Sequence, residues 1–189
     1  PLPSLNGMVA TGGLIDIGAA VQNGPQISIS EGATALSDGG SDWKTWRVRN
    51  TASGRDTDDV LVGTKFTPVS WSRDGMGFYY SRYPADEQGG YDDSRQVAVY
   101  YHLLGTAQAA DQQIHAITDH PTRDPYAELT PDGRFLVLGI EDGYETNGIY
   151  YQRLTTARSG EVIRLLDRWD GRYEFLGAVG EVFYVLSTQ

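Results

Sequence analysis

A strand, an Asp-Gly turn and a second strand recur along this chain, and the repeat constrains the fold more than any other feature. Residues 69–81 have this pattern around Asp74-Gly75, and residues 126–138 repeat it around Asp132-Gly133, 58 residues later. Glycine accepts the positive φ that tight turns need, so Asp-Gly between β-rich runs predicts a β-hairpin. Repeated hairpins predict an all-β protein.

Two further segments extend the repeat in both directions. Residues 26–32 give a first strand that ends in a turn at Glu31-Gly32, 43 residues before Asp74, with a shortened second strand at residues 33–36. Residues 175–186 give a fourth start, 48 residues after Asp132. Between these starts lie further strands at residues 43–49, 97–103 and 148–154, with turns at residues 51–54, near Gly105 and near Ser159-Gly160. Four strands per unit predict the four-stranded antiparallel sheets of β-propeller blades, about three complete blades and the start of a fourth.

Composition agrees with β structure and excludes several classes of function. Glycine is 23 of the 189 residues and aromatic residues are 11%, a pairing typical of short strands joined by tight turns. The absence of cysteine excludes disulfides, thiolate zinc sites and cysteine nucleophiles. A net charge of −10 argues against nucleic acid as a partner, because phosphate affinity comes from Lys and Arg. No apolar stretch approaches the roughly 20 residues of a membrane helix, so no membrane partner is expected; the compartment, cytoplasmic or periplasmic, stays open.

Several short motifs occur one after another along the chain. The first is Ser37-Asp38-Gly39-Gly40-Ser41-Asp42-Trp43, and later ones lie at residues 60–61, 65–66, 71–75, 80–84, 99–106, 127–134 and 141–147. Together they resemble the prolyl oligopeptidase family of serine peptidases over about residues 26–189, leaving residues 1–25 as a non-matching, glycine-rich segment. That family joins an α/β-hydrolase peptidase domain to a seven-bladed propeller, which restricts entry to short peptides. The resemblance implies that this chain is a partial propeller, and nothing in it resembles the peptidase domain.

The candidate catalytic residues do not match the sequence pattern of a known catalytic site. Serine-hydrolase chemistry needs a nucleophile on a strand-to-helix elbow, a histidine base and an orienting carboxylate. The nearest approach to the elbow motif, at residues 39–43, precedes a strand, so Ser41 is interpreted as a turn residue. His102, His115 and His120 are scattered; we interpret His102 as a strand or turn residue and expect neither a base nor a zinc site.

The acidic groups are interpreted as solvated turns rather than calcium sites, because none reproduces a calcium-loop pattern. They are Asp38 with Asp42, Asp56 with Asp58 and Asp59, and Asp92 with Asp93. We therefore expect no catalytic residue, no metal and no cofactor in this chain.

The resemblance places two side chains at a substrate pocket. Tyr79 corresponds to an aromatic position that faces the central cavity in similar enzymes, and Gln152 corresponds to another lining position. Gly148 replaces a residue that is arginine in some relatives, so an arginine contact does not carry over. The remaining strand aromatics are predicted to pack between adjacent blades: Trp71, Phe78, Tyr80, Tyr100, Phe135, Tyr150, Phe183 and Tyr184.

Two functions fit these residues. The first is the non-catalytic gating and substrate-filtering part of a proline-specific serine endopeptidase, with oligopeptides and an α/β-hydrolase peptidase domain as partners. The second is a stand-alone four-bladed propeller that binds peptides or proteins, closed by pairing of residues 8–11 and 14–21 with residues 173–178 and 182–187. An open set of blades would leave unpaired edges, which predicts self-association. A complete hydrolase is disfavoured because no triad is present.

Overall fold

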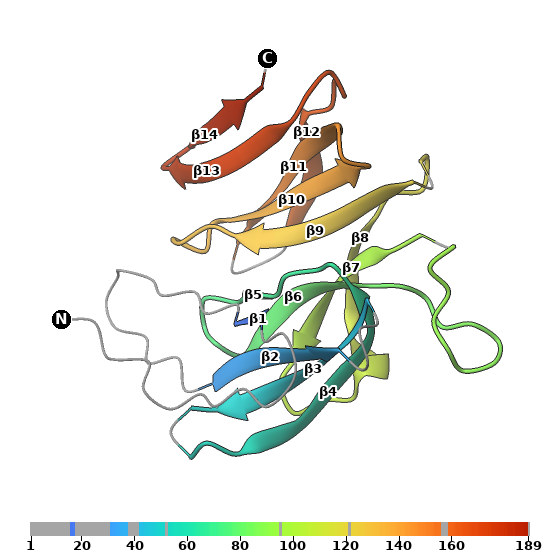
Figure 1. The fold of residues 1–189 in the computed structure, drawn as a ribbon. Helices are drawn as coiled ribbons and strands as arrows, with labels where there is room; N and C mark the ends of the chain where they lie inside the picture. Colours follow the sequence, from blue (N-terminus) through green and yellow to red (C-terminus); the bar gives the residue numbers. More distant parts are fainter. Residues whose placement is uncertain are drawn as a thin grey trace.

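A computed structural model describes residues 16–17, 31–37, 42–51, 53–94, 96–120, 122–155 and 159–188. Strands dominate this part of the chain and form four antiparallel sheets in chain order (Figure 1). The first sheet contains β1 (Asp16–Ile17), β2 (Glu31–Ser37), β3 (Trp43–Asn50) and β4 (Asp56–Lys65). The second contains β5 (Ser70–Trp71), β6 (Gly77–Arg82), β7 (Ala98–Leu103) and β8 (Gln112–Ala116), with a short 3₁₀ helix, η1 (Gln108–Ala110), before β8. The third contains β9 (Arg123–Leu129), β10 (Phe135–Asp142), β11 (Thr146–Leu154) and β12 (Ser159–Leu166), and the fourth contains β13 (Tyr173–Val179) and β14 (Val182–Ser187).

Each sheet is a meander, in which strands that follow one another in sequence lie side by side. The predicted glycine turns are confirmed at both Asp-Gly pairs, where Gly75 has a φ of 70° and Gly133 a φ of 69°. The turns at Gly54 and Gly105 have the same left-handed backbone, with φ of 68° and 76°. Glycine adopts this region without the steric cost that other residues meet there, so these turns close tightly between the strands.

One predicted turn is wrong. Glu31 and Gly32 begin β2 and pair with Asn50 and Arg49, so β2 is a full strand rather than a shortened one. Strand pairing there overrides the turn preference of a single small residue. Ser159 and Gly160, near which another turn was predicted, begin β12, and the residues directly before them lie outside the described residues. The strand expected at residues 26–30 lies outside the described residues.

The ring closure that the alternative of a four-bladed propeller requires is not seen for Asp16 and Ile17, the described part of residues 14–21. Within residues 14–21, the described pair Asp16–Ile17 forms β1 and pairs with β2, with Asp16 opposite Ala35. This pairing places β1 in the first sheet and away from β13 and β14, which form a two-stranded sheet. Residues 8–11 lie outside the described residues. The alternative of a closed four-bladed ring therefore loses the pairing on which it depended.

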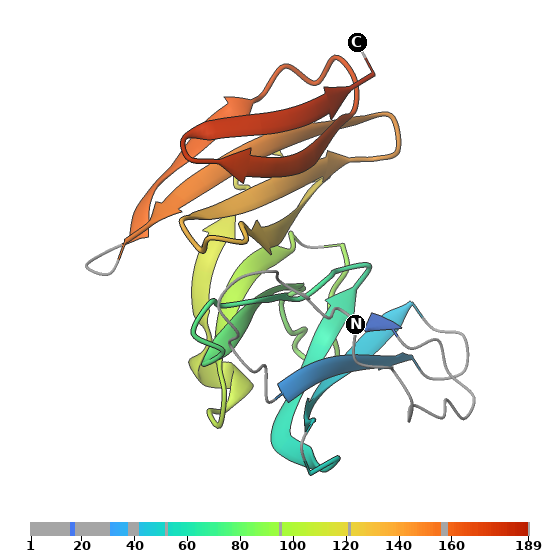
Figure 2. The same ribbon diagram turned by 90° about the vertical axis from the view of Figure 1, so that its left-hand side faces the viewer.

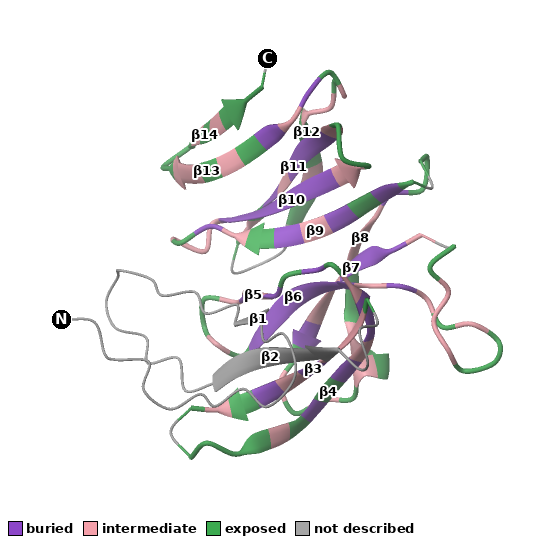
Figure 3. Ribbon diagram, in the orientation of Figure 1, coloured by how far each residue is buried: buried purple, intermediate pink, exposed green. Residues whose placement is uncertain are grey.

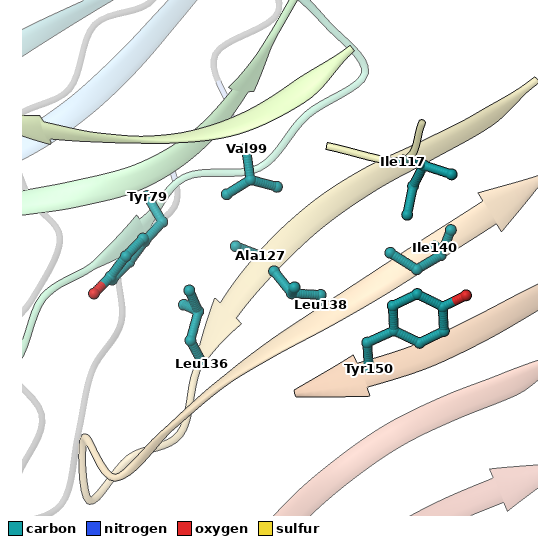
Figure 4. Close-up of a cluster of buried hydrophobic side chains, with 8 residues drawn as sticks. All are labelled: Tyr79, Val99, Ile117, Ala127, Leu136, Leu138, Ile140 and Tyr150. Atoms are coloured by element: carbon teal, nitrogen blue, oxygen red, sulfur yellow. The ribbon is translucent and has the colours of Figure 1, made fainter. Parts of the chain in front are cut away.

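Apolar side chains fill the three interfaces between consecutive sheets. The second and third sheets each lie between two neighbouring sheets (Figure 2), and their strands contain many buried residues (Figure 3). Burial of these side chains from water is the main stabilising contribution. Between the first and second sheets lie Trp46, Val48, Leu61, Val69, Trp71, Phe78 and Tyr80. Between the second and third lie Tyr79, Val99, Ile117, Ala127, Leu136, Leu138, Ile140 and Tyr150 (Figure 4). Between the third and fourth lie Val137, Ile149 and Tyr173, with Leu166, Phe175, Phe183 and Val185 against them.

The predicted packing of strand aromatics is confirmed for most positions, and Tyr184 is the exception. Its residue surface is 52% exposed, on the face of β14 that no described sheet covers. Val182 and Leu186 lie two residues to either side and are 56% and 57% exposed. Side chains two apart share one face of a strand, so β14 presents an apolar face to solvent. No helix in the described ranges is long and apolar enough to cross a membrane.

Candidate functional site

The two residues predicted to line a substrate pocket both face the interface between the second and third sheets. Tyr79 lies on β6, is only 9% exposed, and packs its ring 5.0 Å from that of Tyr101 on β7. Burial, with smaller contributions from Tyr101 and Asp74, raises the pKa of Tyr79 to about 12. Figure 4 shows the Tyr79 ring at one end of the apolar cluster, beside Leu136. The phenol is therefore neutral and largely part of the core.

Gln152 lies on β11 opposite Leu136, and therefore on the same face of the third sheet. Its Nε2 donates a hydrogen bond of 2.7 Å to the carbonyl oxygen of Gly160, and its buried Oε1 has no hydrogen-bond partner within the described chain. A cavity of about 590 Å³ opens beside Tyr79 at the Asp74-Gly75 end of the interface, but Gln152 is not among its lining residues. The structure places the two residues on one interface without joining them in one cavity. Their role as a substrate pocket stays a prediction.

A larger cavity, of about 940 Å³, lies around the start of β9, away from the cavity beside Tyr79. We name it the aromatic cavity. Its walls come from the segment after β4, the ends of β6 and β10, the start of β9 and the approach to β13, so three sheets and the connection to the fourth contribute. Aromatic and charged side chains dominate the lining: Lys65, Phe66, Tyr83, Asp93, Asp124, Tyr126, Glu141, Tyr144 and Arg172.

Two aromatic side chains stand exposed at this cavity. Phe66 is 72% exposed and Tyr144 is 94% exposed. Phe66 also has a φ of 47°, in the left-handed region that a side chain with a Cβ rarely adopts. Such a conformation costs about 1–2 kcal/mol, which the surrounding structure must offset. Exposed rings beside a concave surface are available to a ligand rather than to the core.

Sequence reasoning missed these residues because they lie in connections, not in strands. Phe66 directly follows β4, and Tyr144 lies in the turn between β10 and β11. The available signal was an aromatic residue inside a polar turn, as at Asp142-Gly143-Tyr144-Glu145. A polar turn offers such a ring no predicted core, so its exposure could have been anticipated.

Most charged groups of the aromatic cavity are paired. The Nζ atom of Lys65 lies 2.6 Å from Oδ2 of Asp93, and Nη2 of Arg172 lies 2.9 Å from Oε2 of Glu141. Asp124, at the start of β9, accepts a long hydrogen bond of 3.4 Å from the hydroxyl of Tyr83. Burial raises the pKa of Asp124, and the Tyr83 hydrogen bond opposes that rise.

A second polar group lies between the first and second sheets, where His102 on β7 is enclosed by two carboxylates. Asp59, expected to be a solvated turn residue, is instead 4% exposed on β4, with Oδ1 3.0 Å from Nε2 of His102. Its neighbour Asp58 points outward and is exposed, as strand alternation requires. Asp111 contacts Nδ1 of His102 at 2.8 Å and accepts a hydrogen bond of 2.6 Å from the hydroxyl of Tyr80. The whole group is fully enclosed by protein and joins the two sheets.

The other candidates from the sequence do not gather into a site. His115 lies on β8, with a buried Nε2 that has no hydrogen-bond partner among the described residues, and His120 lies in the connection to β9. Ser41 and Asp38 lie outside the described residues. Within the described ranges, no group of three or more His, Cys, Asp or Glu side chains is placed to hold a metal ion.

Four-stranded antiparallel meanders, packed face to face in chain order with cavities at the ends of their interfaces, define the blades of a β-propeller protein. The family model described as prolyl oligopeptidase, N-terminal β-propeller domain, matches residues 31–189. The chain belongs to the prolyl oligopeptidase family, and it corresponds to the N-terminal propeller portion.

Similar proteins agree with this assignment. A prolyl oligopeptidase of Omphalotus olearius, ophP, is 31% identical, in a match that covers 82% of this chain and 23% of the relative. A prolyl endopeptidase of Elizabethkingia meningoseptica is 29% identical, in a match that covers 83% of this chain and 22% of the relative. A solved prolyl endopeptidase structure superposes with a TM-score of 0.75 at 29% identity, over 84% of this chain and 22% of that one. Prolyl oligopeptidase B from Galerina marginata, bound to a 25mer macrocyclization substrate, has a TM-score of 0.75 at 25% identity, over 84% of this chain and 24% of that one. The chain thus spans about a quarter of the length of the relatives it matches.

Proposed function

We propose that this chain is the part of a proline-specific serine endopeptidase that admits and filters short peptides, without cutting them itself. In this proposal the peptidase domain supplies the chemistry and the sheets limit which peptides reach it. The division suggested by the sequence, a separate segment over residues 1–25 and a partial propeller over residues 26–189, is part of the same proposal.

The aromatic cavity is the observation that carries the proposal. Its volume of about 940 Å³ lies within the range of about 300–1,000 Å³ that is usual for ligand sites, and exposed rings stand at it. An extended peptide could place proline and other apolar side chains against Phe66 and Tyr144, because aromatic faces bury apolar surface at low entropic cost. A folded protein could not enter a cavity of this size.

Peptide binding to the 189-residue chain tests this proposal. We expect N-acetyl-Ala-Ala-Pro-Ala-amide to bind in a calorimetric titration, with no product released on long incubation. Phe66→Ser and Tyr144→Ser each remove one exposed ring and should weaken binding about threefold to tenfold, since an aromatic contact contributes about 0.5–1.5 kcal/mol.

Met76→Ser is the matched control, because Met76 is also exposed, at 57%, but lies next to the Asp74-Gly75 turn and does not line the aromatic cavity. Equal binding by all four proteins, or no binding by the unmodified chain, would contradict the peptide site. Cleavage of the peptide by this chain alone would contradict the non-catalytic role.

A further inference from the structure

One carboxylate of the aromatic cavity has no cationic partner. Lys65 is held by Asp93, and its Nζ atom also lies 4.9 Å from the centre of the Trp43 ring. Arg172 is held by Glu141 and also donates a hydrogen bond of 3.1 Å to the carbonyl oxygen of Tyr144. Within the described part of the chain, no Lys, Arg or His lies within salt-bridge distance of Asp124. The unmatched charge of the cavity is therefore negative and belongs to Asp124.

The surroundings of Asp124 suit a cation that carries an apolar stem. Tyr83 contacts the carboxylate through its hydroxyl, and Phe66, Tyr126 and Tyr144 line the same cavity. A lysine or arginine side chain buries its methylene groups against such surfaces while its charged end reaches a polar partner. Aromatic faces attract the cation as well. An acidic side chain would instead meet Asp93, Asp124 and Glu141, whose neighbouring cations are already paired.

We propose that the aromatic cavity selects peptides with a basic side chain, and that Asp124 determines this preference by pairing with the lysine ammonium or arginine guanidinium group. The inference rests on the proposed function, because it assumes that the cavity takes peptides. It adds a preference for basic side chains to the preference for apolar and proline-containing peptides proposed above. Asp124 acts on selection only and takes no part in bond cleavage.

Three capped peptides test the selection on the 189-residue chain. They are N-acetyl-Ala-Xaa-Pro-Ala-amide with Xaa as lysine, norleucine or glutamate, so the only variable charge is on the side chain. We expect the lysine peptide to bind about threefold to tenfold more tightly than the norleucine peptide, and the glutamate peptide to bind most weakly. The lysine preference should shrink as salt is raised from about 0.05 to 0.5 M, since a partly open ion pair is screened.

Asp124→Asn keeps the shape of the side chain and removes its charge. In this variant we expect the lysine and norleucine peptides to bind equally. Asp58→Asn is the matched control, since Asp58 is an exposed acid on β4 that does not line the cavity, and it should leave the preference intact. Thermal unfolding of each variant checks folding, and the salt dependence in the unmodified chain needs no variant at all.

A titration with n-butylammonium chloride, followed by chemical shifts of tyrosine ring protons, separates the two proposals. If the three peptides bind equally, the charge selection is overturned while the peptide site stands. If the lysine preference survives in Asp124→Asn, the assignment of this selection to Asp124 is overturned while the peptide site stands. If butylammonium shifts the spectrum of the unmodified chain but not of Asp124→Asn, and no peptide binds, the cation site stands and the proposed function fails. If neither probe binds, both proposals are overturned.

Discussion

The Nδ1 atom of His102 lies 2.8 Å from Oδ1 of Asp111, and the side chains of both residues are 1% or less exposed. On the other edge of the ring, Nε2 lies 3.0 Å from Asp59, whose Oδ1 also accepts a hydrogen bond of 2.6 Å from the backbone N–H of Gly105. With both ring nitrogens facing carboxylates, the imidazole is placed to donate on both sides, which requires the protonated form. His102 therefore bridges β4 of the first sheet and the end of η1 in the second.

Removing the ring should unfold the protein more easily. His102→Ala leaves two buried carboxylates without their shared partner, and breaking a buried ionic group in this way costs about 3–5 kcal/mol. We expect a loss of that order in the free energy of unfolding, measured by urea denaturation followed by tryptophan fluorescence. His120→Ala is the control, since His120 is exposed, and should change stability by less than about 0.5 kcal/mol. Similar losses in both variants would show that the bridge does not stabilise the sheets.

The same bridge makes stability depend on pH. Burial acts against the charged imidazole, but the contacts with Asp111 and Asp59 outweigh it and raise the pKa of His102 above its ordinary value of 6.5. Burial also acts against the Asp59 carboxylate, yet hydrogen bonds from Thr57, Gly105 and His102 outweigh it and lower the pKa of Asp59 below 3.8. The histidine contribution is full below about pH 6.5 and is lost as pH rises through the raised pKa. The aspartate contribution is present above about pH 3.8 and is lost as pH falls through the lowered pKa.

We therefore expect the bridge to contribute most between about pH 4 and pH 6.5. Between about pH 5.5 and pH 8.5, the urea concentration at the midpoint of unfolding should decrease more for the unmodified chain than for His102→Gln. The glutamine variant cannot gain or lose this proton. Comparing the two proteins removes the effect of the other titrating groups. Parallel pH profiles would contradict a charged His102 in the folded state.

The local part of this fold and the packing of most strand aromatics between sheets could be predicted from sequence, but particular pairs of residues from different strands and sheets could not. The turns at Asp74-Gly75 and Asp132-Gly133 depend on a few adjacent residues, so their signal is complete within the hairpin. Glu31-Gly32 failed as a turn because pairing with β3, a non-local contact, decided its conformation. For the same reason, the sequence did not reveal that Asp59 is a partner of His102. The two residues are 43 positions apart, and Asp59 belongs to an acidic run that was interpreted as solvated.

The candidate site shows this limit more sharply. Tyr79 was selected from its place in a motif, but its exposure is set by packing against the third sheet, which no pattern on β6 reports. The aromatic cavity exists because strand ends and connections that are far apart in the sequence meet around the start of β9. Phe66 is exposed and has a left-handed backbone, and phenylalanine gives no sequence signal for that conformation. The cavity beside Tyr79 and the aromatic cavity thus lie at opposite ends of β9.

A glycine inside β10 shapes one wall of the aromatic cavity. The ring of Tyr126 packs directly over Gly139, so a Cβ added at this position would overlap the ring. Gly139→Ala should displace Tyr126, destabilise the fold by about 1–3 kcal/mol as other overpacked cores are, and weaken peptide binding. Thermal unfolding and the calorimetric titration measure the two effects.

Gly160→Ala is the matched control for this change. Gly160 also lies in a strand without a positive φ, and the nearest atom to an added Cβ is a carbonyl oxygen at 3.2 Å, so only a small adjustment is needed. We expect its peptide affinity to match that of the unmodified chain. Unchanged affinity in Gly139→Ala as well would show that Tyr126 does not contribute to the binding wall.

The exposed face of β14 leads to the prediction that the 189-residue polypeptide associates with itself. Val182, Tyr184 and Leu186 form an apolar row, and contiguous apolar patches together with open sheet edges favour contact with other chains. Light scattering at micromolar concentration should give a mass of a dimer or more, which falls with dilution. Tyr184→Lys with Leu186→Lys should shift the population to monomer, because two desolvated charges oppose burial of this face. Met76→Lys places a charge on another exposed apolar residue, at 57% exposure, and should leave the mass unchanged. If the unmodified chain stays monomeric at micromolar concentration, association through the fourth sheet is contradicted.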